Sequence, residues 1–417
     1  MTLPSYTSMF RVFGRIGLLS FGGPAAQIAL MHRELVDQRK WLDGPTYLRA
    51  LSLCMLLPGP EAMQLATYAG WRLRGVPGGL LAGVLFVLPG AVLIAGLVAL
   101  YAAYGQVPMV QAAFTGIKAA VIVIVLQALL KLSNKALTGW PAYITAGLSF
   151  VAIFVFDLPF PLIIGAAALF GLLRTPKAQA AVSHHPHPKT TPLRTAIFGL
   201  TLWLSPLIAL SFAGATLLSD IGWFFARLAV VTFGGAYAVL AYMTQTVVEQ
   251  YGWITTAQMI DALGLAETTP GPLILVTQFV AMLTGMAQGG VLLSLAAGAV
   301  ALWATFVPCF LWIFLAGPYL DQIAARPRLS AALSSISAAV VGVILNLSLW
   351  FALHVLFARV TTSGGGLTAM PIPDFATVNW TALALTALAA LLMLGLRVGL
   401  ATALSIMALC GAATEFI

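Results

Sequence analysis

Charged side chains are scarce in this sequence. Only 8% of its 417 residues are Asp, Glu, Lys or Arg, whereas 61% are apolar, and the mean hydropathy is +1.00. A soluble domain could not cover so much apolar surface with so few charges. The composition therefore excludes a soluble protein and predicts a chain that crosses the lipid bilayer several times. Apolar runs near or above the roughly 18 residues that span a bilayer include 78–104, 110–130 and 194–218.

Cysteine and several common motifs are also rare or absent. The three cysteines (Cys54, Cys309 and Cys410) are odd in number and lie in apolar runs, so we predict small core residues rather than disulfide or metal partners. The chain has no Walker loop, no G-x-G-x-x-G and no H-E-x-x-H. No nucleophile clusters with an acid or a base. We therefore predict no enzymatic activity, no cofactor and no metal site.

The positive net charge can be explained by the placement of basic residues in a membrane protein. The net charge is +8, but the basic residues form no dense run, so nucleic acid is not a predicted partner. Their placement instead resembles the cytoplasmic bias of Lys and Arg in membrane proteins. His184, His185 and His187 lie in a proline-rich stretch without a carboxylate or cysteine nearby. A solvated tether therefore explains them better than a metal site.

One pattern occurs twice in the chain. Phe21-Gly22-Gly23, Trp41 and Pro58-Gly59-Pro60 recur as Phe233-Gly234-Gly235, Trp253 and Pro270-Gly271-Pro272, with a constant offset of 212 residues (233 − 21 and 270 − 58). Two copies of one unit in a hydrophobic chain are typical of secondary transporters built from internal repeats. We predict a first repeat at 1–174, a linker and connecting span at 175–221, and a second repeat at 222–417.

Basic residues indicate that the two repeats are inverted. Arg33, Arg39 and Lys40 follow the first broken segment, whereas the equivalent loop 244–256 has no Lys or Arg. Opposite bias in equivalent loops is what inverted topology predicts. The predicted fold is an all-α polytopic membrane protein with two inverted repeats, a cytoplasmic N-terminus, four Gly/Pro-broken re-entrant hairpins and about nine full spans. The broken segments are 9–36, 46–72, 222–247 and 256–286, and the predicted spans are 78–104, 110–130, 140–156, 159–174, 194–218, 290–316, 330–356, 378–394 and 398–416.

The four glycine–proline breaks suggest an anion site. Non-helical backbone at membrane depth is costly unless it lines protein or water. A helix that restarts after such a break presents backbone N–H groups and the positive end of its dipole. We hypothesise that the breaks meet near the midplane and bind a small oxyanion; the alternative is that Gly and Pro only kink ordinary spans. The candidate ligands are the F-G-G and P-G-P residues of both repeats, with Thr268, Thr269, Gln27, Gln64 and Gln278 beside them.

Ionisable residues within apolar segments are further candidates. Lys118, which Ser337 replaces in repeat two, could supply positive charge for an anion or extend to a membrane interface. Glu61 and Glu267 could carry a coupling proton, although a carboxylate at a helix N-terminus is the simpler reading of Glu61. Arg15 and Arg227 occupy equivalent repeat positions, which fits a shared structural or gating role as well as interfacial anchoring. Asp157 fits a turn.

Several stretches resemble the chromate ion transporter family. They cover both halves of the chain, and they are F-G-G-P-A-A (21–26), M-H-R-E-L-V (31–36), K-W-L (40–42), L-L-P-G-P-E-A-M-Q-L-A-T-Y-A-G-W (56–71), F-V-L-P-G (86–90), V-T-F-G-G-A-Y-A-V-L (231–240), E-Q-Y-G-W (249–253) and G-L-A-E-T-T-P-G-P-L (264–273). One departure is that Pro24 follows the first F-G-G, whereas Ala236 follows the second. The two breaks therefore need not contribute equally.

The resemblance implies a function. It implies a multi-pass carrier of the bacterial inner membrane that exports chromate, is driven by the proton gradient and confers chromate resistance. It names sulfate, an isosteric dianion, as a candidate competitor, and it places the F-G-G and P-G-P residues and Lys118 at the substrate. A sulfate-like oxyanion importer or exchanger, and an uncoupled anion channel, remain alternatives. Small-residue helix faces would allow a homodimer.

Overall fold

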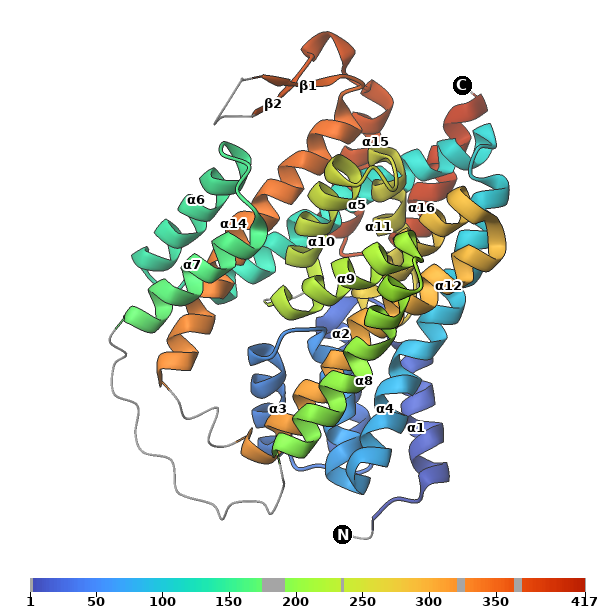
Figure 1. The fold of residues 1–417 in the computed structure, drawn as a ribbon. Coiled ribbons are helices and arrows are strands. Elements are labelled where there is room, and N and C mark those ends of the chain that lie inside the picture. The colour runs from blue at the N-terminus through green and yellow to red at the C-terminus, as the bar shows by residue number, and fades with distance from the viewer. Residues whose placement is uncertain (1–2, 175–191, 234–235, 321–326, 364–369, 417) are drawn as a thin grey trace. The chain divides into compact units, whose positions relative to one another are not determined.

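The computed structural model describes residues 3–174, 192–233, 236–320, 327–363 and 370–416. Nearly all of these residues are helical, as the composition predicts (Figure 1). The prediction missed one antiparallel hairpin between β1 (Val360–Ser363) and β2 (Met370–Pro373), in which Val360 pairs with Pro373. The β-branched run V-T-T-S favours a strand, and it was overlooked because it is short and lies in a loop. Residues 175–191 of the predicted linker and connecting span (175–221) lie outside the described residues.

Helix lengths divide the predicted spans into two groups. Among the described residues, five helices are long and apolar enough to cross a membrane: α4 (Glu61–Tyr104), α5 (Pro108–Ala136), α8 (Pro192–Phe212), η3 to η4 (Leu273–Tyr319, containing α12, Val276–Ala316) and α14 (Pro327–Leu356). The other predicted spans coincide with shorter apolar helices. α6 (Trp140–Phe154) has 15 residues and α7 (Phe160–Leu173) has 14. At 1.5 Å per residue, such helices are only about 22 Å long, less than the roughly 30 Å hydrocarbon core.

Each predicted broken segment contains a helix, an interruption and a second helix. The first has α1 (Tyr6–Leu19) and α2 (Gly23–His32), and its counterpart has α9 (Thr216–Val231) and α10 (Ala236–Thr244). Both end in a π-helix, η1 (Arg33–Gln38) and η2 (Gln245–Gln250), at equivalent repeat positions. At the two P-G-P breaks, α3 (Gly44–Leu56) leads into α4, and α11 (Thr256–Thr268) leads into η3 (Leu273–Leu275) and α12.

The long helices α4 and α12 are themselves helical hairpins. Arg74 and Gly75 leave helical geometry in α4, and Gly289 and Gly290 do so in α12. Glycines allow the two arms to pack closely. A Cβ on Gly70 would collide with the backbone of Gly78 in the opposite arm of α4. Gly285 has the same relation to Leu293 and Ser294 in α12. In each repeat, a half-helix therefore follows the P-G-P break and turns back tightly into a long helix.

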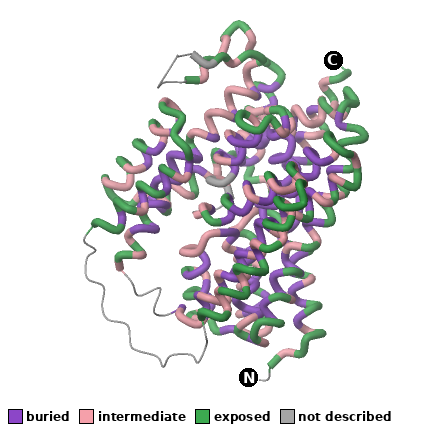
Figure 2. The backbone as a smooth tube through the Cα atoms, viewed as in Figure 1, coloured by how far each residue is buried: buried purple, intermediate pink, exposed green. Residues whose placement is uncertain are grey.

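The chain folds into two compact units, and each draws on both halves of the sequence. Unit 1 comprises 1–98, 175–236 and 269–330, and unit 2 comprises 99–174, 237–268 and 331–417. In unit 1, α12 packs against α8 and α9 (Figure 1). Buried positions are dense along α4 and α12 and sparse along α8, where only Trp203 and Leu207 are buried (Figure 2). The mostly exposed apolar surface of α8 suits contact with lipid.

Unit 2 is organised around α5. This helix packs against α11, α15 (Trp380–Ala390) and α16 (Leu400–Ala413). Gly116 on α5 and Gly411 on α16 remove the side chains that would separate these two backbones. The remaining short elements are η5 (Phe375–Thr377), η6 (Leu391–Gly395) and η7 (Thr414–Phe416), with η4 (Gly317–Tyr319) in unit 1. The core beside Lys118 contains Ala119, Ala120, Val123, Ala389, Ala403 and Met407.

Candidate functional site

The breaks of the two repeats are hydrogen-bonded to each other within unit 1. Gly59 of the first P-G-P donates its N–H to the carbonyl oxygen of Thr232, at 2.8 Å. Gly271 of the second P-G-P donates its N–H to the carbonyl oxygen of Ser20, at 2.9 Å. Gly59 and Gly271 are repeat equivalents, and so are Ser20 and Thr232. Each P-G-P break is therefore held by the residue that precedes the F-G-G of the other repeat.

The residues before the F-G-G triplets end their helices in the same way. Ser20 Oγ donates to the carbonyl of Ile16 at 2.5 Å, and Thr232 Oγ1 donates to the carbonyl of Leu228 at 2.6 Å. Both hydroxyls are directed back along their own helix. The main-chain carbonyls of Ser20 and Thr232, which have left the helix, can then accept from the opposite glycine. The sequence difference between Ser and Thr does not disturb this arrangement.

The three candidate glutamines use their amide nitrogens inside the protein. Gln27 Nε2 donates to the carbonyls of Ser20, at 3.1 Å, and Gly271, at 2.7 Å. Gln64 Nε2 donates to Pro58 O at 2.7 Å, and Gln278 Nε2 donates to Ala91 O at 2.9 Å. All three side chains are buried. Each amide nitrogen thus donates to a main-chain carbonyl, and the role of these glutamines as substrate ligands stays a prediction.

The first F-G-G break opens directly into helix α2. Gly22 and Gly23 have φ values of 84° and 77°, which are strained for residues with a side chain. Helix α2 then begins with Pro24 in its first turn, and its N-cap provides no side-chain hydrogen bond. Phe21 is 42% exposed. No side chain caps the first-turn N–H groups of α2. These groups could therefore donate hydrogen bonds to an anion. Gly234 and Gly235 of the second break lie outside the described residues, and Phe233 is half-buried.

The P-G-P triplets are more enclosed than the first F-G-G. Gly59, Pro60 and the whole of Pro270-Gly271-Pro272 are buried, and Pro58 is half-buried. A Cβ on Gly59 would lie 2.8 Å from Cys309 Sγ, and one on Gly90 would collide with the carbonyl of Pro270. Cys309 and Gly90 are themselves repeat equivalents (309 − 90 = 219, the same offset that relates Lys118 to Ser337). The P-G-P breaks therefore form a packed, pseudo-symmetric crossing of the two repeats.

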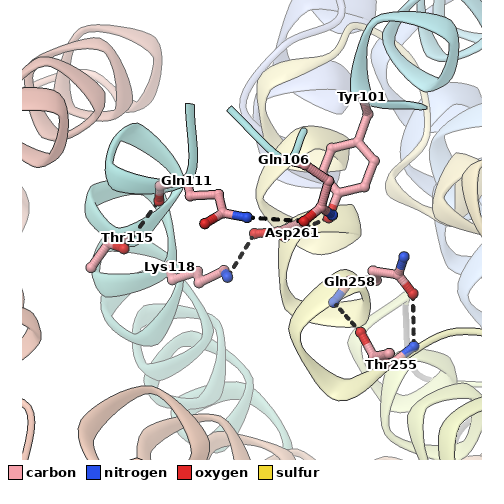
Figure 3. A network of polar contacts seen from close by, with 8 residues as sticks. All are labelled: Tyr101, Gln106, Gln111, Thr115, Lys118, Thr255, Gln258 and Asp261. Atoms are coloured by element: carbon pink, nitrogen blue, oxygen red, sulfur yellow. Dashed lines mark hydrogen bonds and ion pairs between the residues drawn. The ribbon is translucent and has the colours of Figure 1, made fainter. Parts of the chain in front are cut away.

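Lys118 lies in unit 2 and is paired with an acid (Figure 3). Its Nζ is 3.1 Å from Oδ1 of Asp261 on α11, and the side chains are 22% and 7% exposed. Tyr101, near the end of α4, donates its hydroxyl to Asp261 Oδ2 at 2.8 Å. The sequence analysis singled out Lys118 and overlooked Asp261 and Tyr101. An acidic residue inside the apolar stretch 256–268 was a signal that could have identified Asp261.

The two candidate coupling carboxylates lie in different surroundings. Glu61 begins α4 in unit 1, where the helix dipole favours a negative charge. Glu267 is buried in unit 2 and accepts a hydrogen bond from the Tyr237 hydroxyl at 2.7 Å. Of the neighbouring threonines, Thr268 is half-buried and its Oγ1 donates to the carbonyl of Leu265 at 2.7 Å, whereas Thr269 is buried. The repeat relation does not extend to these acids.

The equivalent arginines also have different partners. Arg15 lies 3.8 Å from the buried carboxylate of Glu34, which also binds Arg39. Arg227 donates its Nε to the carbonyl of Trp223 at 3.3 Å. Glu34 belongs to π-helix η1, and its counterpart in η2 is Thr246. Arg15 therefore has a local structural partner, and a role common to both arginines stays a prediction.

A polar pocket in unit 2 is unsuited to an anion. It has a volume of about 220 Å³, and its lining includes Asp157, Gln245, Glu249 and His354. Asp157 occupies a turn with φ 48° and accepts a hydrogen bond from Gln245. Burial raises the pKa of Asp157, and burial together with the nearby Asp157 charge raises the pKa of Glu249. The described lining contains no lysine or arginine to attract a dianion, and either carboxylate repels one whenever it is ionised.

Comparison with known proteins identifies the family. Residues 7–172 and 219–414 match the family described as chromate transporter. The chain belongs to the chromate transporter family. This confirms the resemblance found in the sequence. The two matched regions leave out the stretch 173–218 between the halves. No solved structure matches this chain.

Individual relatives in the chromate transporter family are similar over most of their length. A probable chromate transport protein of Synechococcus elongatus is 31% identical over 82% of this chain and 84% of that protein. A chromate transport protein of Cupriavidus metallidurans is 32% identical over 82% of each chain. One from Pseudomonas aeruginosa is 31% identical over 82% of this chain and 79% of that protein. Together with the apolar helices, membership in this transporter family indicates a membrane transport protein of the bacterial inner membrane.

Proposed function

We propose that this protein is a secondary transporter that exports chromate across the bacterial inner membrane, is energised by the proton-motive force and confers chromate resistance. The observation that carries the substrate assignment is the match of both halves of the chain to the chromate transporter family. The relatives named as chromate transport proteins support the same substrate. The N-terminus is proposed to be cytoplasmic.

The geometry of the breaks supports a carrier rather than a channel. Paired interruptions that cross between two repeats are the usual construction of substrate sites in secondary transporters. The reciprocal bonds of Gly59 and Gly271 provide such a crossing. Candidate substrate ligands are present in each unit: the first-turn N–H groups of α2 in unit 1 and the ammonium of Lys118 in unit 2. The P-G-P residues and the glutamines Gln27, Gln64 and Gln278 are proposed to hold the breaks in shape around the substrate.

Uptake of radiolabelled chromate into everted membrane vesicles tests this function. In everted vesicles, export appears as uptake, and we expect it to be saturable, competed by sulfate and abolished by an uncoupler. Vesicles without the protein give the background. If sulfate accumulates and chromate does not, the chromate assignment and the resistance role are wrong. Uptake that does not saturate and ignores the uncoupler would instead identify an anion channel.

A further inference from the structure

Lys118, the lysine predicted to bind the anion, forms an ion pair with Asp261, so the two side chains together carry no net charge. Lys118 Nζ and Asp261 Oδ1 are 3.1 Å apart, and little of either side chain is exposed. A dianion approaching Lys118 in this state would also approach the Asp261 carboxylate. Repulsion by the acid offsets attraction by the lysine at similar distances. In this ionised state the pair therefore does not attract an anion.

Protonation of Asp261 would open this site. It removes the negative charge and leaves a partly buried ammonium without a counter-ion, which is unfavourable. An incoming oxyanion relieves that cost by taking the place of the carboxylate beside Lys118. Conversely, a bound oxyanion beside Asp261 favours the protonated acid. Each binding event therefore strengthens the other, and the coupling is reciprocal.

Within the part of the chain that the structure describes, few other charged or titratable groups lie near Asp261. Lys118 comes from α5 and Tyr101 from α4, and α16, which also packs against α11, has no charged side chain within its bounds. On α11 itself, the other acid is Glu267, whose carboxylate accepts the Tyr237 hydroxyl. The protonation of Asp261 thus depends on its burial, on Lys118 and Tyr101, and on any anion that binds.

A polar row leads along α5 to the ion pair. Gln111, Thr115 and Lys118 are spaced to lie on one face of the helix. Gln111 is exposed and donates its Nε2 to Gln106 Oε1 at 3.1 Å, and the group lies beside Tyr101 and Asp261 in Figure 3. The row therefore places polar side chains between an exposed end of α5 and Lys118.

We propose that Lys118 and Asp261 form a proton-linked anion site, in which one proton binds to Asp261 for each tetrahedral oxyanion that binds at Lys118. This rests on the proposed function, because it assumes that an oxyanion is the substrate. The proton comes from the aqueous phase and forms an O–H bond on the Asp261 carboxyl. The ammonium of Lys118 exchanges its ion pair with Asp261 for one with the oxyanion.

The repeat relation limits this device to one site per chain. The counterpart of Lys118 is Ser337 (337 − 118 = 219), and the counterpart of Asp261 is Arg49 (261 − 49 = 212). Neither a lysine nor an acid recurs at the equivalent positions. The carried unit of one dianion and one proton then has a net charge of −1. A membrane potential that is negative inside drives that charge outward. A pH gradient that is acidic outside opposes export of the accompanying proton.

Equilibrium binding of anion as a function of pH tests the proposal. Purified full-length protein in detergent is titrated with radiolabelled chromate and, separately, with radiolabelled sulfate, which stays a dianion from mildly acidic to alkaline pH. We expect sulfate affinity to fall about tenfold per pH unit on the alkaline side of the transition, as one linked proton requires. Adding saturating sulfate to weakly buffered protein should take up about one proton per chain.

Three variants separate the linked site from a merely structural ion pair. Asp261→Asn imitates the protonated acid, so it should bind sulfate with little pH dependence and without proton uptake. Lys118→Met should bind at least about tenfold more weakly at every pH, and Lys118→Arg should restore part of the affinity. Because Lys118→Met leaves Asp261 unpaired and could misfold, the double variant Lys118→Met/Asp261→Asn keeps the site neutral and should also bind weakly. Lys135→Met, near the end of α5, is the matched control and should behave as wild type.

The outcomes distinguish this inference from the proposed function. If wild-type protein binds an oxyanion with the same affinity at every pH and takes up no proton, the linkage is wrong and the transport function stands. Unchanged pH dependence in Asp261→Asn likewise overturns the role of Asp261. If neither chromate nor sulfate binds to the wild-type protein, both proposals fail.

Discussion

At the residue scale, the two P-G-P glycines have backbone conformations that favour glycine over any residue with a side chain. Gly59 has φ 121° and Gly271 has φ 94°. A Cβ on Gly59 would lie 2.8 Å from both Cys309 Sγ and Gln64 Nε2. Side chains at positive φ are strained, and here the strain would fall on the hydrogen bonds that join the repeats. The glycines are therefore required for the crossing as well as for the turn.

We expect Gly59→Ala to destabilise the protein by about 1–3 kcal/mol, the typical cost of a strained backbone conformation. Thermal unfolding in detergent, followed by tryptophan fluorescence, measures the loss. Gly14→Ala is the matched control, because it has no positive φ and its Cβ would meet nothing within 4 Å. Equal melting temperatures for the two variants would contradict a structural role for the Gly59 conformation.

Some features of these sites could be predicted from the sequence and some could not. The repeated P-G-P triplets predict interruptions at these positions. The repeat offset, however, states which residues are equivalent and not which are in contact. The bond between Gly59 and Thr232 joins residues far apart in the chain, so it depends on the fold. The partnership of Lys118 with Asp261 is of the same kind, although the intramembrane acid itself could have been noticed.

At the element scale, both repeats use the same helical hairpin after the P-G-P break. The half-helix 61–73 turns at Gly75 and packs against the rest of α4 through Gly70 and Gly78. Without side chains at these contacts, the two backbones approach closely, and a helix pair gains van der Waals contact that lipid would not replace. The hairpin positions the first P-G-P break relative to its long helix.

Gly70→Ala should therefore destabilise the protein even though alanine is the better helix former. The added methyl would meet the Gly78 carbonyl, and such overpacking typically costs about 1–3 kcal/mol. The same substitution at Gly96, farther along α4, meets nothing within 4 Å and should be neutral or stabilising. Denaturation in detergent compares the two variants. A Gly70→Ala protein as stable as Gly96→Ala would show that the arms do not depend on this contact.

Hydrophobic pattern located the helices better than it fixed their lengths. Uniformly apolar stretches have no amphipathic period, so their ends are marked only by glycine, proline or polar residues. The turn at Asp157 separates α6 and α7, which have 15 and 14 residues and lie within the spans predicted at 140–156 and 159–174. The π-helices η1 and η2 were also unpredicted. Their sequences, R-E-L-V-D-Q and Q-T-V-V-E-Q, share only Val36/Val248 and Gln38/Gln250 and give no common signal for a π-turn.

At the scale of the whole molecule, the repeats make a prediction about the membrane. The turn of the α4 hairpin follows Arg72, and the equivalent turn of the α12 hairpin follows the uncharged residues around Gln288. Positive residues favour the cytoplasmic side. If the repeats are inverted, these equivalent turns lie on opposite sides of the membrane. If they are parallel, both turns lie on the same side.

Single cysteines at these two positions test the inversion, because Arg72 and Gln288 are both exposed. The background keeps Cys54 and Cys309, which are buried, and replaces the half-buried Cys410 with serine. With an impermeant thiol reagent, we expect Arg72→Cys to react in everted vesicles and Gln288→Cys to react in intact spheroplasts. The unsubstituted background controls for reaction at native cysteines. Labelling of both positions from one side would exclude inverted repeats. Opposite labelling would mean that the reciprocal bonds of Gly59 and Gly271 join breaks that enter the membrane from opposite faces, the arrangement found in carriers built from inverted repeats.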